Sequence, residues 1–151
     1  MLQPLIVWKL ALISDKTADD NRGYFSRNHM KKIVIVDDEI EICTELTELL
    51  KEAGYLPFSS YRGHDGYDLI VREKPDLVIL DIALPDVDGT IVYEKIRKNP
   101  DLKNTRVLFL TALASGAPQE FAGVTRADYS IISKPVQFDF LHREIERLLD
   151  M

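Results

Sequence analysis

Residues 76–89 read DLVILDIALPDVDG and contain a continuous apolar run, LVIL at 77–80. A continuous apolar run of this length is typical of a strand that is buried on both faces, as in parallel sheets. The run stops directly at Asp81, and Pro85 and Gly89 follow as loop-forming residues. This stretch therefore predicts a buried strand that ends on a carboxylate, and it raises the question of what that carboxylate does.

Comparable apolar runs lie on both sides of this stretch. Residues 33–36 and 107–110 are continuous runs, and residues 57–60 and 130–133 are weaker strand candidates. Segments of helical spacing separate the strands at residues 42–53, 67–73, 90–98, 118–126 and 138–149. Five strands alternating with five helices predict an α/β fold, in which a doubly wound parallel sheet is covered by helices on both sides in three layers. Pro57 indicates that its strand lies at an edge of the sheet, and Gly54 is expected to end the first helix.

Residues 1–29 differ in character from the rest of the chain. Their apolar run, residues 2–13, is about a dozen residues long and contains Lys9, whereas a membrane-spanning helix needs roughly 20 apolar residues. The run also lacks the basic leader and the small-residue cleavage site of a signal peptide. We therefore expect residues 1–29 to be an N-terminal extension outside the domain, and residues 30–151 to form one globular domain.

The composition limits the classes of partner. The chain has 151 residues, 46% of them hydrophobic, which is enough for a single packed core. Its formal net charge of -6 argues against nucleic acid and membrane surfaces as main partners, because both repel an acidic protein. Cys43 is the only cysteine, so an intramolecular disulfide and a cysteine-based zinc cluster are excluded, which suits a reducing cytoplasm.

Polar side chains follow four of the predicted strands at the points where these strands end. They are Asp37, Asp38, Asp81, Thr111 and Lys134. In open parallel sheets, ligands bind outside the carboxyl ends of the strands, so these side chains are expected to meet. Carboxylates repel each other by about 4 kcal/mol per pair at 4 Å and an effective dielectric constant near 20, so a cation must join them. Carboxylate oxygens favour Mg²⁺, and the three histidines show no spacing that would indicate a transition-metal site.

Four motifs in a fixed order carry a family resemblance. They are VDDE at 36–39, LDIALPDVDG at 80–89, TA at 111–112 and KP at 134–135. Each motif alone is a weak signal, but together they resemble the receiver domain of bacterial response regulators, a CheY-like domain, over residues 31–150. This resemblance implies a flavodoxin-like sheet with the strand order 2-1-3-4-5.

The resemblance also implies the chemistry of the strand ends. Asp81 would attack a phosphoryl group carried by a kinase histidine and become an aspartyl phosphate, so it would be the phosphoacceptor of a two-component signalling pathway. Asp38 and Asp81 would bind Mg²⁺ directly and Asp37 would bind it through water. The backbone carbonyl of Ala83 would complete the set of protein ligands.

Lys134 and Thr111 would each hold one phosphoryl oxygen. In receivers, an aromatic residue three positions before the lysine usually follows the movement of the hydroxyl residue, but this chain has Ile131 there. Thr111 and Ile131 are therefore the candidate switch residues. The implied partners are a sensor histidine kinase or a histidine phosphotransfer protein, and a protein effector that binds the surface of the fourth helix, fifth strand and fifth helix.

Three further residues are expected to have structural roles. Pro85 and Gly89 would shape the loop after Asp81 and start the next helix. Glu39 would help to start the helix that follows the first strand, where a carboxylate suits the positive end of the helix dipole.

Two other classes of protein remain open as alternatives. One is a docking module that keeps the receiver fold without being phosphorylated. Ile131 keeps this alternative open, but the complete set of site residues favours an active receiver; they are Asp37, Asp38, Asp81, Thr111 and Lys134. The other is a phosphotransferase of the haloacid dehalogenase type, but its motif requires a second aspartate where this chain has Ala83. We therefore expect a signalling domain rather than a turnover enzyme, either as a stand-alone receiver or as part of a longer protein.

Overall fold

The computed structural model describes residues 29–112 and 129–150 of the chain. In chain order the elements are β1 (Lys32–Val36), α2 (Ile40–Glu52), β2 (Leu56–Ser60), α3 (Gly63–Glu73), β3 (Leu77–Leu80), α4 (Gly89–Lys98), the short 3-10 helix η2 (Pro100–Leu102), β4 (Arg106–Thr111), β5 (Tyr129–Ser133) and α5 (Phe138–Leu149). Every strand expected from the sequence is present, and no strand end differs from its predicted position by more than one residue.

The five strands form one parallel sheet in the order β2-β1-β3-β4-β5. This order confirms the predicted doubly wound, flavodoxin-like sheet. Pro57 lies on β2, which is an edge strand, so its missing backbone donor leaves no gap in the interior of the sheet. The chain leaves β1 toward β2 and then returns to the other side of β1 at β3, so the strand order reverses between β1 and β3. In folds of this kind, that reversal creates the crevice where ligands bind.

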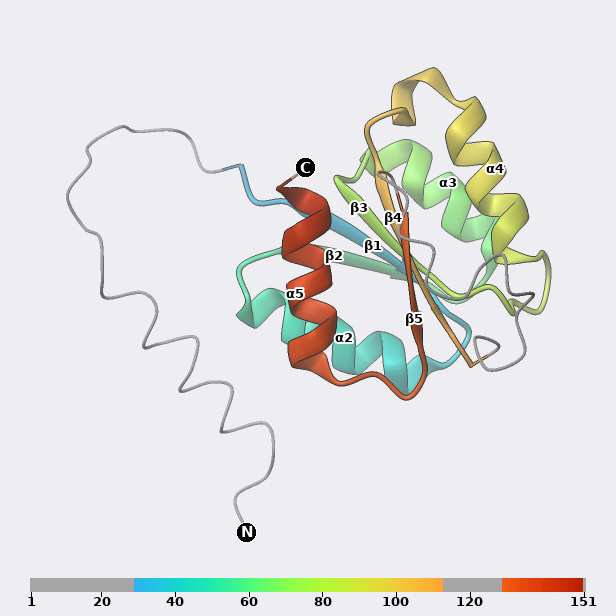
Figure 1. The fold of residues 1–151 in the computed structure, drawn as a ribbon. Helices are drawn as coiled ribbons and strands as arrows, with labels where there is room; N and C mark the ends of the chain where they lie inside the picture. Colours follow the sequence, from blue (N-terminus) through green and yellow to red (C-terminus); the bar gives the residue numbers. More distant parts are fainter. Residues whose placement is uncertain (1–28, 113–128, 151) are drawn as a thin grey trace, which may run out of the picture.

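Helices cover both faces of the sheet, as the three-layer prediction requires (Figure 1). On one face α2 and α5 pack against alternate strand residues such as Ile35, Ile79 and Leu110. On the other face α3 and α4 pack against the residues between them, such as Val36 and Leu80. Because all four residues of β3 are buried and β3 is paired on both edges, the residue that follows it starts from a rigid position.

Helix α3 begins at Gly63, four residues before the start predicted from its spacing of apolar residues. The extra turn is stabilised from outside the helix, because the carboxylate of Asp86 accepts hydrogen bonds from the backbone amides of Gly63 (2.8 Å) and His64 (2.9 Å). A cap supplied by a distant loop leaves no local signal in the helix sequence.

Two other expectations concern the remaining helices. The helix predicted at residues 118–126 lies outside the described residues. The first helix ends as predicted, since Gly54 follows it with φ +90°, a left-handed conformation that favours glycine. Within residues 29–112 and 129–150, no helix has both the length and the apolar character that crossing a membrane requires.

Candidate functional site

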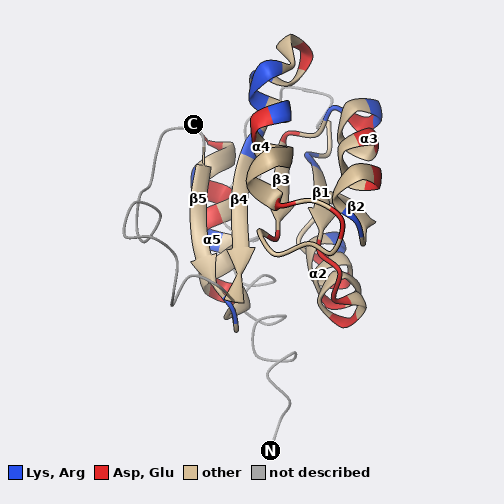
Figure 2. Cartoon of the chain, turned by 90° about the vertical axis from the view of Figure 1, so that its right-hand side faces the viewer, with Lys and Arg blue, Asp and Glu red and all other residues tan. Residues whose placement is uncertain are grey.

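The carboxyl ends of β1 and β3 bring the predicted carboxylates together. Val36 pairs with Leu80 across the two strands, and the amide of Asp81 donates to the carbonyl of Val36 at 2.9 Å. Asp37, Asp38 and Asp81 each contribute an oxygen to a group in which these oxygens all lie within 4.8 Å of one another. Figure 2 shows acidic residues gathering at this end of the sheet and continuing along α2. The fold therefore brings these three aspartates together, as the strand ends predicted.

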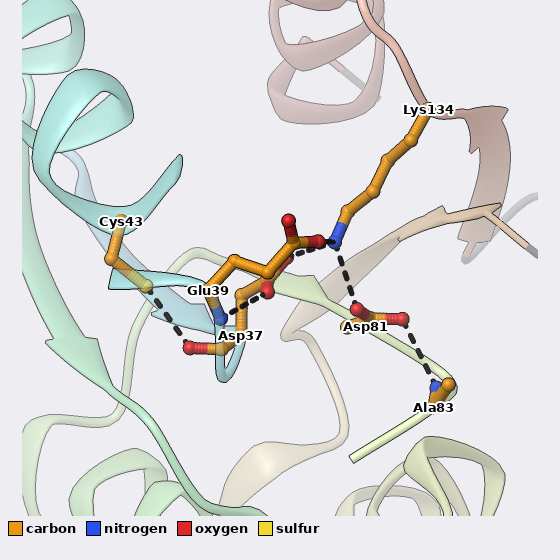
Figure 3. A network of polar contacts seen from close by, with 6 residues as sticks. All are labelled: Asp37, Glu39, Cys43, Asp81, Ala83 and Lys134. Carbon is orange, nitrogen blue, oxygen red and sulfur yellow. Dashed lines mark hydrogen bonds and ion pairs between the residues drawn. The ribbon is translucent and has the colours of Figure 1, made fainter. Parts of the chain in front are cut away.

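Lys134 from the end of β5 supplies the positive charge to this cluster (Figure 3). Its Nζ lies 2.7 Å from Asp37 Oδ2, 2.7 Å from Glu39 Oε1 and 2.9 Å from Asp81 Oδ2, and the side chain is only 9% exposed. Burial alone lowers the pKa of the Lys134 ammonium, but its close contacts with these three carboxylates outweigh burial and raise the pKa. Lys134 therefore stays charged and partly neutralises the acidic cluster.

Asp37 is the most deeply buried of the three aspartates that form the cluster, at 2% exposure. Burial raises the pKa of the Asp37 carboxyl, and its contacts with Lys134 and with the amide of Glu39 offset this only in part. Its Oδ1 accepts a hydrogen bond from the Glu39 amide at 2.9 Å, whereas its buried Oδ2 has the ion pair with Lys134 but no hydrogen bond. A buried oxygen with unused acceptor capacity, beside two further carboxylates, fits a hard divalent cation such as Mg²⁺ and its bound water.

The loop after Asp81 folds back onto the carboxylate that it carries. The amide of Ala83 donates to Asp81 Oδ1 at 3.0 Å, so both oxygens of Asp81 have a partner, the other being Lys134. Gly89 closes the loop by donating its amide to the carbonyl of Ile82 at 2.8 Å. A Cβ on Gly89 would lie 2.1 Å from the backbone oxygen of Asp81, so only glycine fits there. This close approach explains the spacing between Asp81 and Gly89 noted in the sequence.

Thr111 ends β4, the strand beside β3, and is fully buried. Its backbone carbonyl accepts a hydrogen bond from the Lys134 amide at 3.0 Å, which holds the ends of β4 and β5 together. Ile131 is half-buried on β5 and packs on the α3 and α4 side of the sheet. Tyr129, two residues earlier, is buried there against the rings of Phe109 and Tyr93, with ring centroids 5.9 and 5.5 Å away. Tyr129 is thus part of the core.

Glu39 lies at the start of α2, as predicted, and has a further contact that was not predicted. It occupies the N-cap position, but its side chain makes no capping hydrogen bond, and its carboxylate accepts a hydrogen bond from Lys134. The contact with Lys134 adds Glu39 to the acidic cluster. A usable signal was present, since Glu39 directly follows two strand-end aspartates.

Cys43 on α2 is buried, and its thiol donates to the carbonyl of Asp37 at 3.2 Å. Burial raises the pKa of the thiol to about 11, so it remains protonated. Cys43 is a core residue. The metal-binding candidates among residues 29–112 and 129–150 form a single cluster, and that cluster contains neither a cysteine nor a histidine.

Comparisons with known proteins agree with this geometry. The sequence profile described as "Response regulator receiver domain" matches residues 33–146. A CheY-like response regulator receiver domain protein from Methanospirillum hungatei is 30% identical, with a TM-score of 0.69 over 80% of this chain and 94% of that chain. The response regulator TrrA from Thermotoga maritima, solved in complex with Mg²⁺ and BeF, is 33% identical, with a TM-score of 0.65 over 79% of this chain and 99% of that chain.

A third similar structure is the BeF3-activated N-terminal receiver domain of RstA from Klebsiella pneumoniae, which is 26% identical, with a TM-score of 0.66 over 80% of this chain and 99% of that chain. Receiver domains bind Mg²⁺ at an acidic pocket and interact with histidine kinases or phosphotransfer proteins and with effector domains. The profile match spans most of the chain, and the strand order agrees with it. The chain therefore belongs to the response regulator receiver domains, a family of two-component signalling domains rather than of turnover enzymes.

Proposed function

We propose that Asp81 accepts a phosphoryl group from a phosphohistidine of a sensor histidine kinase or of a histidine phosphotransfer protein. The observation that supports this most directly is the position of Asp81 at the end of the buried strand β3, with its Oδ2 2.9 Å from the Lys134 ammonium. A nucleophile must be held in line with its leaving group, and a rigid strand end does this.

In the proposed step, one carboxylate oxygen of Asp81 forms a bond to phosphorus while the bond between phosphorus and the histidine nitrogen breaks. The electron pair of that bond leaves with the imidazole nitrogen. Such a transfer asks little covalent chemistry of the protein beyond positioning and neutralising charge on the equatorial oxygens. We assign this task to Lys134, which would pair with one phosphoryl oxygen, and to Thr111, whose hydroxyl would donate to another.

We further propose that the acidic cluster holds Mg²⁺. Asp38 and Asp81 would bind it directly, Ala83 would supply its backbone carbonyl, and Asp37 would bind it through water. The unused acceptor capacity of the buried Asp37 Oδ2 supports the last assignment. When bound, the cation would supply positive charge that stabilises the transferred phosphoryl group.

The proposed output is a change in protein contacts. Phosphorylation would change the conformation of a surface that includes β5 and α5, with Thr111 and Ile131 as switch residues. A protein effector would bind this surface. Residues 118–126, expected to complete the surface, lie outside the described residues. We also propose that the domain spans residues 30–151, with residues 1–29 outside it, and that the protein acts in the cytoplasm. The family match to residues 33–146 supports the boundary, and the buried Cys43 thiol suits a reducing compartment.

The test is the intact mass of the protein after incubation with acetyl phosphate and Mg²⁺. Wild type should gain one phosphoryl group, whereas Asp81→Asn and a wild-type sample without metal should gain none. A folded wild type that gains no phosphoryl group in the presence of Mg²⁺ would refute the proposal. The leading function would then be docking without phosphorylation.

A further inference from the structure

The carboxylate of Asp86 connects the loop after β3 to the start of α3. Its Oδ1 accepts from the amide of Gly63 at 2.8 Å, and its Oδ2 accepts from the amide of His64 at 2.9 Å and lies 2.7 Å from the His64 ring Nδ1. The Asp86 side chain is 8% exposed. The bonds from the His64 and Gly63 amides hold the pKa of the Asp86 carboxyl well below its usual range. Asp86 is therefore a fixed charged contact between two elements 22 and 23 residues apart in the chain.

Ile82, Leu84 and Val87 of this loop pack against the apolar core on the α3 and α4 side of the sheet, but few hydrogen bonds join the loop to other elements. Residues 81–88 contain no helix or strand, and the loop's backbone hydrogen bonds beyond Asp81 stay within the loop or join it to the start of α4. Among the described residues, Asp86 makes the only hydrogen bonds from residues 82–88 to a helix or strand other than α4. Asp86 is therefore the polar link between this loop and α3.

Packing makes this contact tight. A Cβ on Gly63 would lie 2.3 Å from Val87 Cγ1 and 3.2 Å from Leu84 Cδ1, so the first residue of α3 lies directly against the loop on both sides of Asp86. A loop that is hydrogen-bonded at Asp86 and packed at its neighbours has little freedom to move away from α3.

We propose that Asp86 is a positioning residue for the metal site, because it ties to α3 the loop that carries the Ala83 carbonyl. This inference rests on the proposed function, in which Ala83 is a metal ligand. Asp86 does not touch the metal, and it acts only by fixing the backbone three residues after Ala83. Since the coupling of two sites is reciprocal, metal binding should in turn protect the Gly63 and His64 amides from exchange with solvent.

The test compares Asp86→Ala with the matched control Asp88→Ala in the full chain. Asp88 lies in the same loop and also caps a helix, but its carboxylate accepts only from Thr90, within its own helix α4. Both variants lose one negative charge and one cap, so only the connection to α3 differs. The measurements are the Mg²⁺ dissociation constant by calorimetry, the exchange rates of the Gly63 and His64 amides with and without Mg²⁺, and stability in urea.

Asp86→Ala should weaken Mg²⁺ binding about tenfold, as loss of groups that orient metal ligands does, whereas Asp88→Ala should change it by less than about twofold. The rate of phosphorylation of Asp86→Ala should recover at saturating Mg²⁺. If Asp86→Ala fails to fold, Asp86→Asn, which keeps one acceptor oxygen, should still weaken binding at least about twofold.

Unchanged Mg²⁺ affinity in Asp86→Ala, with stability lost, would overturn the inference and leave Asp86 as a helix cap. Equal losses of affinity in Asp86→Ala and Asp88→Ala would also overturn it, because charge alone would then explain the effect. A folded wild type that binds no Mg²⁺ would refute the proposed metal site itself, and this inference with it.

Discussion

Replacing Gly89 with alanine should displace the loop that begins at the phosphoacceptor. The added Cβ would lie 2.1 Å from the backbone oxygen of Asp81 and 2.8 Å from the Cα of Ile82, and real Cβ contacts are essentially never shorter than 3.0 Å. The backbone must therefore shift by at least 0.9 Å, the difference between 3.0 and 2.1 Å. Both obstructing atoms belong to the backbone, so no side-chain rotation can relieve the contact.

The magnitude of the effect follows from this shift. Overpacking at a tight site costs about 2 kcal/mol of the free energy of unfolding. The obstructing oxygen belongs to Asp81, so we expect part of the shift to displace this residue. A displacement of about 1 Å can slow a positioned reaction about 100-fold, so phosphorylation of Gly89→Ala should slow by up to about that factor. The defect should persist at saturating Mg²⁺ and in protein that is fully folded.

The assay is the rate of phosphorylation by acetyl phosphate, followed by intact mass, together with unfolding in urea. Gly54→Ala is the matched control, because Gly54 has φ +90° and no atom within 4 Å of its would-be Cβ, and it follows α2 at the opposite end of the sheet. That variant should lose about 1 kcal/mol through backbone strain and phosphorylate at the wild-type rate. A Gly89→Ala protein that phosphorylates within threefold of wild type would refute the reasoning from the Asp81 contact.

Three further changes test the electrostatics of the fold and of the site. Lys134→Ala leaves buried carboxylates without their cation, so it should lower the free energy of unfolding by about 3 kcal/mol, measured in urea at pH 7 without Mg²⁺. A decrease of less than about 1 kcal/mol would contradict this. The hydrogen bonds from Arg147 lower the pKa of Glu144 below its ordinary value of 4.5. Ionised Glu144 therefore stabilises the fold at pH values above 4.5, and this contribution disappears as the pH falls through the folded-state pKa. In urea titrations, Glu144→Gln should therefore lower the free energy of unfolding by about 1 kcal/mol at pH 7 and by progressively less below pH 4.5. The control Glu146→Gln, at an exposed side chain, should change it little at either pH. Mg²⁺ at about ten times its dissociation constant should stabilise wild type by about 1.4 kcal/mol in thermal or urea unfolding, EDTA should reverse this, and Asp38→Asn should lose most of the effect.

Most of the fold and of the cluster could be predicted because both depend on local patterns. Continuous apolar runs located β1, β3 and β4 to within one residue, since a strand buried on both faces has no polar position to interrupt it. Once the strands were known to be parallel, the residues that follow them had to meet at one edge. Asp37, Asp38 and Asp81 were found in this way. The strand order was predicted from the family resemblance and not from these patterns.

The two features that sequence patterns missed both depend on partners far away in the chain. Glu39 bonds to Lys134 across 95 residues, and Asp86 bonds to Gly63 across 23. For α2, local reasoning assigned the carboxylate of Glu39 to the helix start, and for α3 the spacing of apolar residues placed the start four residues too late. The fold instead turns the carboxylate of Glu39 toward Lys134 at the acidic cluster and brings Asp86 from another loop to cap α3. A helix N-terminus attracts a carboxylate whatever its origin, so the local pattern indicates that a cap is needed but cannot say which residue supplies it. As a result, Lys134 has a third carboxylate partner, and Asp86 links the loop after Asp81 to α3, which is the link that we propose positions the metal site.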